Sequence, residues 1–185
     1  MIELTTPTLE RLPHYVDALE RGWSPDNVRG RIAAEEQLAA IEQDAAGFVA
    51  RQTDPEAQAG AVTLPDGSTV ARIPGRHFWI WDGAFCGTLG FRWQHGSAAL
   101  PAHVLGHVGY SVVPWKQRLG CATAALRAVL PLARAQGLAF LEITTDPDNI
   151  ASQKVITGNG GVLVESFTPP AAFGAAPGLR FRIPL

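Results

Sequence analysis

The sequence has few cysteines, no excess of positive charge and no long apolar run, and each absence excludes a class of protein. Two cysteines, Cys86 and Cys121, cannot build a disulfide framework or a four-cysteine zinc site, which favours a reducing, cytoplasmic compartment. The 15 Lys and Arg against 17 Asp and Glu give a formal net charge of −2, whereas nucleic-acid-binding domains are normally basic. No apolar run reaches the roughly 18 residues that indicate a membrane span. Glu3 and Glu10 stand where a secretory signal is basic, so no export is expected.

The composition is that of a folded domain. Of the 185 residues, 46% are hydrophobic and 17% are charged, which is enough for a core, and the length predicts one domain over residues 1–185. Residues 1–75 begin with a short strand at Ile2–Leu4, followed by apolar residues at helical spacing. Residues 51–75 hold few large apolar side chains, which predicts a long loop or a weak hairpin around Pro65-Asp66-Gly67.

Two proline dipeptides predict where the N-terminal helices start. Thr6-Pro7 and Ser24-Pro25 each combine an N-cap residue with proline at the first helical position, and Gly22 predicts the end of the first helix. The apolar period then runs from Val28 to Val49 with a break around Glu35-Glu36. This predicts one bent helix or two short ones.

From residue 76 onward the period changes to two, which predicts a sheet. Asp82-Gly83 is a strong hairpin signal, and Gly109 inside a strand predicts a bulge or a close approach to the backbone. Pro131 falls on the outer face of the long helix, where its missing N–H is tolerated. The predicted elements are strands at 77–81, 84–93 and 104–113, a helix at 120–136, a strand at 138–145, a helix at 150–157, and strands at 162–167 and 179–183.

The connection between the third strand and the long helix carries an anion-binding pattern. Gln117–Ala122 fits Q/R-x-x-G-x-G/A, with Gly120 at the expected helix start. Backbone N–H groups of the turn and of the first helical turn point at one spot and attract a negative group. The small residues Gly120 and Ala122 keep these amides accessible. The G-K-S/T ending of a nucleotide P-loop is absent, and the alternative is an ordinary strand–turn–helix connection.

In this context the sequence resembles the GNAT-superfamily N-acetyltransferases. Their pyrophosphate-binding turn has the pattern of Gln117–Ala122, Asp148–Ile156 looks like the family's N-x-x-A/S helix start, and Gly160–Leu163 resembles the exit from that helix. The resemblance covers residues 76–167 and is greatest to uncharacterised acetyltransferases with GHIGY and NGG segments. It implies an α+β, GNAT-like acyl-CoA N-acyltransferase fold, with a mixed, mostly antiparallel central sheet flanked by helices. Strands four and five are expected to splay apart.

The resemblance also implies acetyl-CoA as cosubstrate, bound by residues 76–167, with residues 168–185 adding a loop and a strand. Strand-four backbone groups are expected to contact the pantetheine arm, the turn to hold the pyrophosphate, and the helix start at Asn149 to reach the pantetheine or thiol. Asn149 can be a plain N-cap at the same time, and the alternative for Lys154 is solvated surface. The residues assigned to acetyl-CoA are Val112, Val113, Gln117, Arg118, Leu119, Gly120, Cys121, Ala122, Thr123, Asn149, Ser152 and Lys154.

One position departs from the family pattern. Many members carry a tyrosine seven residues after the asparagine, as the acid that protonates the leaving thiolate, and Ile156 stands there. The candidates for that acid are Tyr110, Ser152 or a water molecule. The candidates for the base that deprotonates the amine are His107, Glu142 or a bound water. The alternative for His107 is a core histidine bonded to the backbone.

No metal is expected. His103 and His107 have the spacing of a helical metal site, but the period of two places them in extended chain, roughly 13 Å apart. Cys121 is expected to be a small buried residue, although a helix N-terminus can lower the pKa of a thiol.

The expected function is direct acetyl transfer to a primary amine of a small molecule or peptide. A non-catalytic acyl-CoA-binding or sensing module is the alternative, favoured by the missing tyrosine, and a plain interaction protein is a third hypothesis. No nucleic acid or membrane partner is expected. The oligomeric state is left open, a homodimer included. Residues 51–75, 94–103 and 168–178 are expected to shape the acceptor site.

Overall fold

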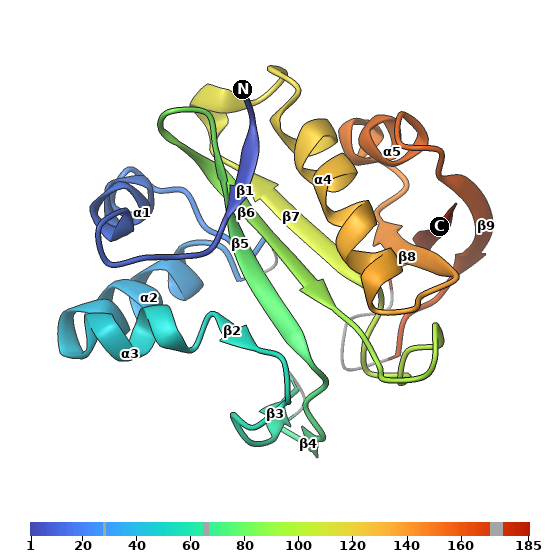
Figure 1. Cartoon of the computed structure of the whole chain (residues 1–185), viewed down its shortest axis with the longest axis horizontal. Coiled ribbons are helices and arrows are strands. Elements are labelled where there is room, and N and C mark those ends of the chain that lie inside the picture. The colour runs from blue at the N-terminus through green and yellow to red at the C-terminus, as the bar shows by residue number, and fades with distance from the viewer. Residues whose placement is uncertain (28, 65–66, 171–175) are drawn as a thin grey trace.

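The computed structural model describes residues 1–27, 29–64, 67–170 and 176–185, which contain two larger β-sheets and a two-stranded one, with helices on both sides of the first (Figure 1). The first sheet has the order β1-β5-β6-β7, with β2 paired to β5, and the second has the order β8-β10-β9. The strands of the first sheet are β1 (Glu3–Thr5), β2 (Thr53–Asp54), β5 (Gly75–Trp81), β6 (Phe85–Arg92) and β7 (Val108–Val112). Those of the second are β8 (Phe140–Thr145), β9 (Val162–Phe167) and β10 (Gly178–Pro184).

The remaining elements are five α-helices, a 3-10 turn and a small hairpin within the described residues. Their bounds are α1 (Leu12–Glu20), α2 (Arg31–Gln43), α3 (Ala45–Ala50), β3 (Val62–Thr63), β4 (Thr69–Val70), η1 (Pro114–Lys116), α4 (Cys121–Ala135) and α5 (Ile150–Thr157). Every strand pairing among them is antiparallel. The α+β class with a mostly antiparallel sheet flanked by helices is therefore confirmed, whereas the parallel pairing that a mixed sheet requires does not occur in the described residues. No helix of the described residues is long and apolar enough to cross a membrane.

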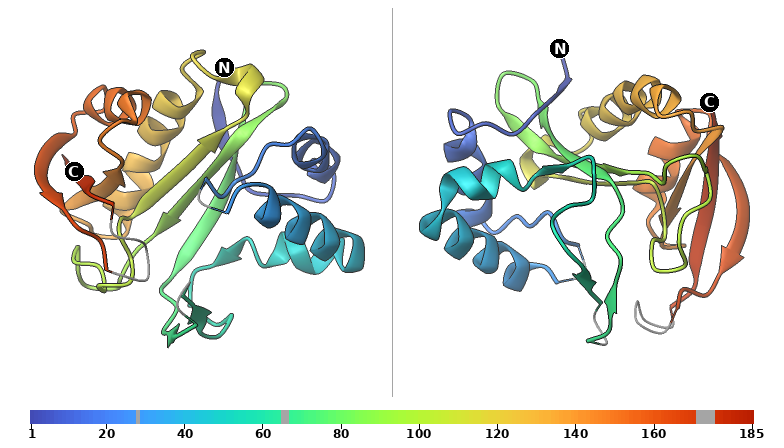
Figure 2. Two further views of the ribbon diagram at one scale, coloured as in Figure 1. Left: turned by 180° about the vertical axis from the view of Figure 1, so that it is seen from behind. Right: turned by 60° about the horizontal axis from the view of Figure 1, so that its bottom comes forward.

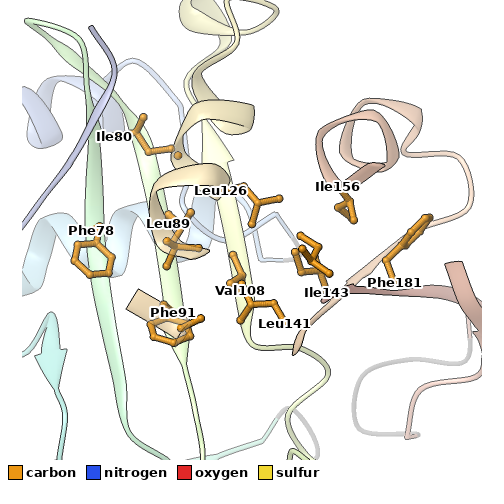
Figure 3. Close-up of a cluster of buried hydrophobic side chains, with 14 of the residues drawn as sticks. Phe78, Ile80, Leu89, Phe91, Val108, Leu126, Leu141, Ile143, Ile156 and Phe181 are labelled. Atoms are coloured by element: carbon orange, nitrogen blue, oxygen red, sulfur yellow. The ribbon is translucent and has the colours of Figure 1, made fainter. Parts of the chain in front are cut away.

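Alternation along the strands separates two cores, one on each face of the first sheet. On one face, Leu89 and Val108 pack with Leu126 of α4 and Ile143 of β8 (Figure 3). On the other face, residues such as Trp79 pack beneath α1–α3, and Figure 2 shows these helices and α4 on opposite sides of β5–β7. The two cores fix β7 from both faces.

Strands β7 and β8 meet at one point and then belong to separate sheets. The N–H of His107 donates to the carbonyl oxygen of Glu142 at 2.7 Å, and the N–H of Glu142 donates to Nδ1 of His107 at 2.9 Å. A Cβ on Gly106 would lie 3.0 Å from the carbonyl oxygen of Glu142, so glycine permits this close approach. Beyond these two hydrogen bonds, β7 and β8 belong to separate sheets, which is the splay predicted for strands four and five.

Both N-terminal helices begin later than predicted. Helix α1 starts at Leu12 rather than after Thr6-Pro7, with a proline in its first turn. Ser24 does not cap a helix, because its Oγ accepts from the N–H of Asp26 in a turn, and α2 starts at Arg31. Gly22 does end α1, with a left-handed φ of 89°.

The break between the next two helices is at Asp44, not around Glu35-Glu36. The Asp44 carboxylate accepts from the N–H of Gly47 at 2.8 Å and so caps α3. A local side-chain bond therefore ended α2, which the apolar spacing could not indicate. Val28, Pro65, Asp66 and residues 171–175, on which other predictions rest, lie outside the described residues.

Gly109 does not form the predicted bulge. The β6–β7 register runs without a shift from Gly87–Val112 to Phe91–Val108. The close backbone approach lies across from β7, at Gly87, where φ is 146° and a Cβ would lie 2.1 Å from the carbonyl oxygen of Ser111. Pro131 is exposed on the outer face of α4, as predicted.

Candidate active site

The turn from β7 into α4 has the backbone of an anion site. Arg118 and Gly120 both adopt left-handed conformations, with φ of 62° and 81°, and Gly120 is the N-cap of α4. The first intrahelical bond runs from Ala124 to the carbonyl oxygen of Gly120, so the amides of Cys121, Ala122 and Thr123 come before it. The first turn of α4 contains no acidic residue, and open space lies in front of Gly120. A negative group fits this end of the helix.

Side chains outside the turn hold it in place. Nζ of Lys116 donates to both carboxylate oxygens of Asp82, at 3.0 and 2.8 Å, which ties the turn to the β5–β6 hairpin. The guanidinium of Arg21 lies 3.5 Å from the ring centroid of Trp115, and Nε2 of Gln117 donates to the carbonyl oxygen of Val112. Gln117 therefore braces the turn against the end of β7, while Arg118 and Leu119 are exposed.

Asp82, Cys86 and Cys121 form a cluster beneath this turn, with one ligand-type atom of each within 4.8 Å of the others. Burial, followed by the proximity of Cys121 and Asp82, raises the pKa of Cys86 to about 12, so its thiol is protonated at neutral pH. The hydrogen bond from Lys116 lowers the pKa of Asp82. Because the carboxylate is already bound by an ammonium group, we interpret the cluster as packing beneath α4. Cys121 is buried, as expected of a small core residue.

Strand β7 turns half of its backbone groups toward the splay. The N–H of Val113 donates to the carbonyl oxygen of Cys86, and the carbonyl oxygen of His107 accepts from the backbone N–H of Arg92. The odd-numbered residues of this segment therefore bond to β6. Alternation in an antiparallel ladder then points the backbone groups of Tyr110 and Val112 away from β6. Of the two valines expected to contact pantetheine, Val112 has this orientation, whereas the Val113 amide is used inside the sheet.

A polar link crosses from β7 to α5 on the splayed side. Oη of Tyr110 lies 2.8 Å from Oγ of Ser152, and the Ser152 N–H donates to Oδ1 of Asn149 at 3.0 Å. Asn149 is thus the predicted N-cap of α5. Burial raises the pKa of Tyr110, so its hydroxyl keeps its proton at neutral pH. Ile156, at the position of the family's tyrosine, is fully buried in the core, and Lys154 is exposed.

His107 is not placed as a base. Its side chain is fully buried, and burial lowers its pKa to about 4, so the ring is neutral. Nδ1 accepts from the backbone of Glu142, which assigns the ring proton to Nε2 and leaves no lone pair for an amine. The His107 ring packs against Phe140, with ring centroids 6.2 Å apart. His107 holds β8 against β7 through two hydrogen bonds to the backbone of Glu142.

Glu142 is also poorly placed to take a proton. Its carboxylate oxygens lie 3.3 Å from Nε of Arg180 and 3.0 Å from Nε of Arg182, and the side chain is 12% exposed. The carboxylate is therefore engaged by two arginines of β10. The two sequence-predicted bases thus lie together, but as structural groups.

Two side chains that the sequence analysis missed lie on the face of the sheet beneath α1–α3. His77 on β5 and Arg92 on β6 flank the paired glycines Gly90 and Gly109. Two effects lower the pKa of His77: desolvation, which is the larger, and the positive charge of Arg92. The imidazole is therefore neutral at pH 7, although the residue is exposed. The signal in the sequence was a histidine, two glycines and an arginine on one face of strands that are otherwise apolar. Only the strand register shows that they meet.

Comparison with known proteins identifies the fold and the family. Similar solved structures include the ribosomal α-N-protein acetyltransferase RimL with coenzyme A (14% identity, TM-score 0.63, 98% of this chain and 92% of that one). The microcin self-immunity acetyltransferase MccE, in complex with acetyl-CoA and AMP, is 12% identical (TM-score 0.63, 100% and 92% covered). Mycobacterium smegmatis RimJ, with a CoA disulfide, is 16% identical (TM-score 0.63, 99% and 81% covered). These likenesses show the fold, and no curated protein matches the sequence. Residues 10–162 match the family model described as an acetyltransferase (GNAT) domain, and the chain therefore belongs to the GNAT acetyltransferase family, a family of acyltransferases.

Proposed function

We propose that the protein transfers the acetyl group of acetyl-CoA directly to a primary amine, without a covalent enzyme intermediate. The observation that carries this proposal is one continuous path along β7. An anion-binding turn lies at its end, backbone groups of Val112 and Tyr110 face the splay, and a protonated tyrosine lies beside them. Along this path the groups follow the order of the cosubstrate, from its phosphates to its thioester.

The residues present fit acetyl-CoA in kind and in order. The amides of Arg118–Thr123 would hold the pyrophosphate at a helix end that carries no opposing acid. Val112 offers its backbone to the amides of the pantetheine arm, as a sheet edge does to an added strand. Asn149 and Ser152 lie across the splay and would contact the thiol end. When bound, acetyl-CoA supplies the activated acyl group and a thiolate leaving group.

Tyr110 supplies two groups for the transfer. Its backbone N–H points to the splayed side and would donate to the thioester oxygen as negative charge develops there. Its hydroxyl would give a proton to the thiolate as the carbon–sulfur bond breaks and the carbon–nitrogen bond forms. Ser152, 2.8 Å away, orients this hydroxyl. The tyrosinate regains a proton from solvent.

His77 is the base that we assign to the amine. A neutral imidazole can accept the proton that the attacking nitrogen must lose, directly or through one water. Its ring lies beside Gly90, whose register partner Gly109 precedes Tyr110. This assignment replaces His107, whose Nδ1 lone pair accepts from the Glu142 backbone, and Glu142, whose carboxylate is paired with two arginines.

Two measurements separate this function from the alternatives. Acetyl-CoA should raise the unfolding temperature, because binding to the native state alone adds about 2.7 kcal/mol at a hundredfold excess over Kd. Thiol release with a panel of primary amines should show turnover. A shift without turnover would favour the acyl-CoA-binding module, which the isoleucine at position 156 supports. No shift would favour an interaction protein and exclude both.

A further inference from the structure

A bare area of sheet lies on the face beneath α1–α3, at the ends of β5, β6 and β7 opposite the anion-binding turn. Gly90 pairs with His77 on one side and with Gly109 on the other. Two residues further along, Thr88 pairs with Trp79 of the core under these helices, so period two places the three residues on the same face. We call this row the glycine floor.

One imidazole and one guanidinium group lie over the glycine floor. A Cβ on Gly90 would lie 3.1 Å from Cδ2 of His77, and a Cβ on Gly109 would lie 3.5 Å from Nη2 of Arg92. A side chain at Gly90 would therefore push the imidazole away, and one at Gly109 would touch the guanidinium. The two polar groups lie directly on the two glycines.

The Arg92 guanidinium has an unusual environment. The guanidinium lies against the sheet, with Nη2 3.5 Å from the position of a Cβ on Gly109, and desolvation by the neighbouring protein atoms lowers its pKa. No residue of the described ranges offers it a carboxylate or a hydrogen bond. Eight other arginines do have a carboxylate partner: Arg11, Arg21, Arg29, Arg31, Arg51, Arg72, Arg180 and Arg182. A desolvated guanidinium without a partner is stabilised by an anion that arrives with a ligand.

This anion is not the pyrophosphate of the cosubstrate. The backbone N–H of Arg92 donates to the carbonyl oxygen of His107, which lies just before the start of β7. The anion-binding turn follows Val112, at the other end of this strand. The five residues of β7 put roughly 13 Å or more between the two ends. The floor nevertheless adjoins the reacting centre, because Gly109 directly precedes Tyr110. A molecule on the floor is therefore placed to present an amine to the thioester.

We propose that the acceptor is an amine that also carries a carboxylate or phosphate group, and that Arg92 binds this group. The proposal rests on the function proposed above and adds the substrate class to it. The planar fork of the guanidinium matches both anions and would hold the acceptor by two parallel hydrogen bonds. Gly90 and Gly109 let the His77 and Arg92 side chains lie against the sheet, so the acceptor would lie over these two side chains with its amine toward His77.

The test is turnover with matched pairs of amines and acetyl-CoA. Each pair contains a free carboxylate or phosphate in one member and the corresponding amide, or the alcohol, in the other: amino acids with their amides, and phosphoethanolamine with ethanolamine. We expect kcat/KM to be at least about tenfold higher for the anionic members, from the usual strength of hydrogen bonds between charged groups. Preference for carboxylates or for the phosphate distinguishes the two sources of the anion.

Arg92→Gln should lower kcat/KM for anionic amines by roughly 10- to 100-fold, mainly through KM, and should change kcat/KM for neutral amines much less, so that the selectivity is lost. Arg92→Lys should restore part of the loss. Arg76→Gln is the matched control, because it removes an arginine from the neighbouring strand that lines a groove with Phe91 and Trp93 on the opposite face. Its kinetics should equal those of the unaltered protein.

The outcomes distinguish a failure of this proposal from a failure of the proposed acetyl transfer. Equal or better use of neutral amines, or an Arg92→Gln variant with unchanged selectivity, overturns the role of Arg92 while acetyl transfer stands. No turnover of any amine overturns acetyl transfer and this proposal together. Loss of selectivity in Arg76→Gln as well would mean that net charge, not the glycine floor, selects the acceptor, and would also overturn it.

Discussion

A carboxylate placed at Gly120 tests the position of the pyrophosphate. Gly120 is the N-cap of α4 in a left-handed conformation, and a Cβ there meets nothing within 4 Å, so the space that a ligand would use is the space a new side chain would enter. Aspartate tolerates left-handed backbone better than most residues. Gly120→Asp therefore adds charge and a short side chain without removing a contact of the fold.

The magnitude follows from the charges. Two unit charges about 5 Å apart repel by about 3 kcal/mol at an effective dielectric constant of about 20. Screening at an exposed turn reduces this value, and the second charge of a pyrophosphate increases it. We expect Kd for CoA, measured by titration calorimetry, to rise by roughly 100-fold at low salt and by less at high salt.

Two controls separate charge from backbone strain. Gly120→Asn has nearly the same shape and conformational preference without the charge, so it should keep most of the affinity. Gly137→Asp places the same residue in a left-handed position at the other end of α4, where φ is 75°, and should bind CoA normally. CoA affinity that is equal in Gly120→Asp and Gly120→Asn would refute the placement of the pyrophosphate.

Three further substitutions test the groups assigned along β7 and β5. Tyr110→Phe should lower kcat by about 100-fold without weakening CoA binding, and an unchanged rate would remove the hydroxyl as the acid. His77→Gln should lower kcat/KM for the amine at least about tenfold. The unaltered protein should lose activity as the pH falls through the lowered pKa of His77, and persistence of this acid limb in His77→Gln would assign it to another group. His107→Ala should lower the free energy of unfolding by about 2–4 kcal/mol in urea titrations, because it creates a cavity and leaves the Glu142 N–H unpaired.

The pH dependence of stability gives a second readout for His107. Its ordinary pKa of 6.5 falls to about 4 in the folded protein, so the unfolded chain binds more protons between these values. Stability from this group is therefore full above about pH 6.5 and is lost toward pH 4, by at most about 3 kcal/mol. The difference in stability between the original protein and His107→Ala should shrink over that range in urea titrations. A constant difference would contradict the burial of a neutral ring.

The conformation of the turn to which we assign the cosubstrate was predictable from the sequence because it is local. The turn pattern Gln117–Ala122 lies within six residues, and its function depends on backbone amides whose direction follows from a strand, a turn and a helix start. Asn149 as a cap is similarly short-range, and it is confirmed. Tyr110 and Ser152 were named separately, but their 2.8 Å contact joins residues 42 positions apart.

The acceptor side was not predictable because it depends on register. His107 alternated with its neighbours as a cleft residue would, yet the close approach of β8 turned its Nδ1 to the Glu142 amide. His77 and Arg92 gained a shared environment only because β5, β6 and β7 pair so that Gly90 faces both His77 and Gly109. Periodicity assigns a residue to a face, but a shift of one residue in any pairing would move every one of these side chains.

This contrast separates two kinds of site. A site built from backbone N–H groups constrains few side chains, so glycine at one left-handed position and small residues beside it are sufficient to keep it. A site built from side chains on a sheet surface can change its selectivity by one substitution on a strand that the core already holds. The proposed phosphate site is of the first kind, and the proposed acceptor site on the glycine floor is of the second. The acceptor should therefore be sought through Arg92, and not through the turn at the start of α4.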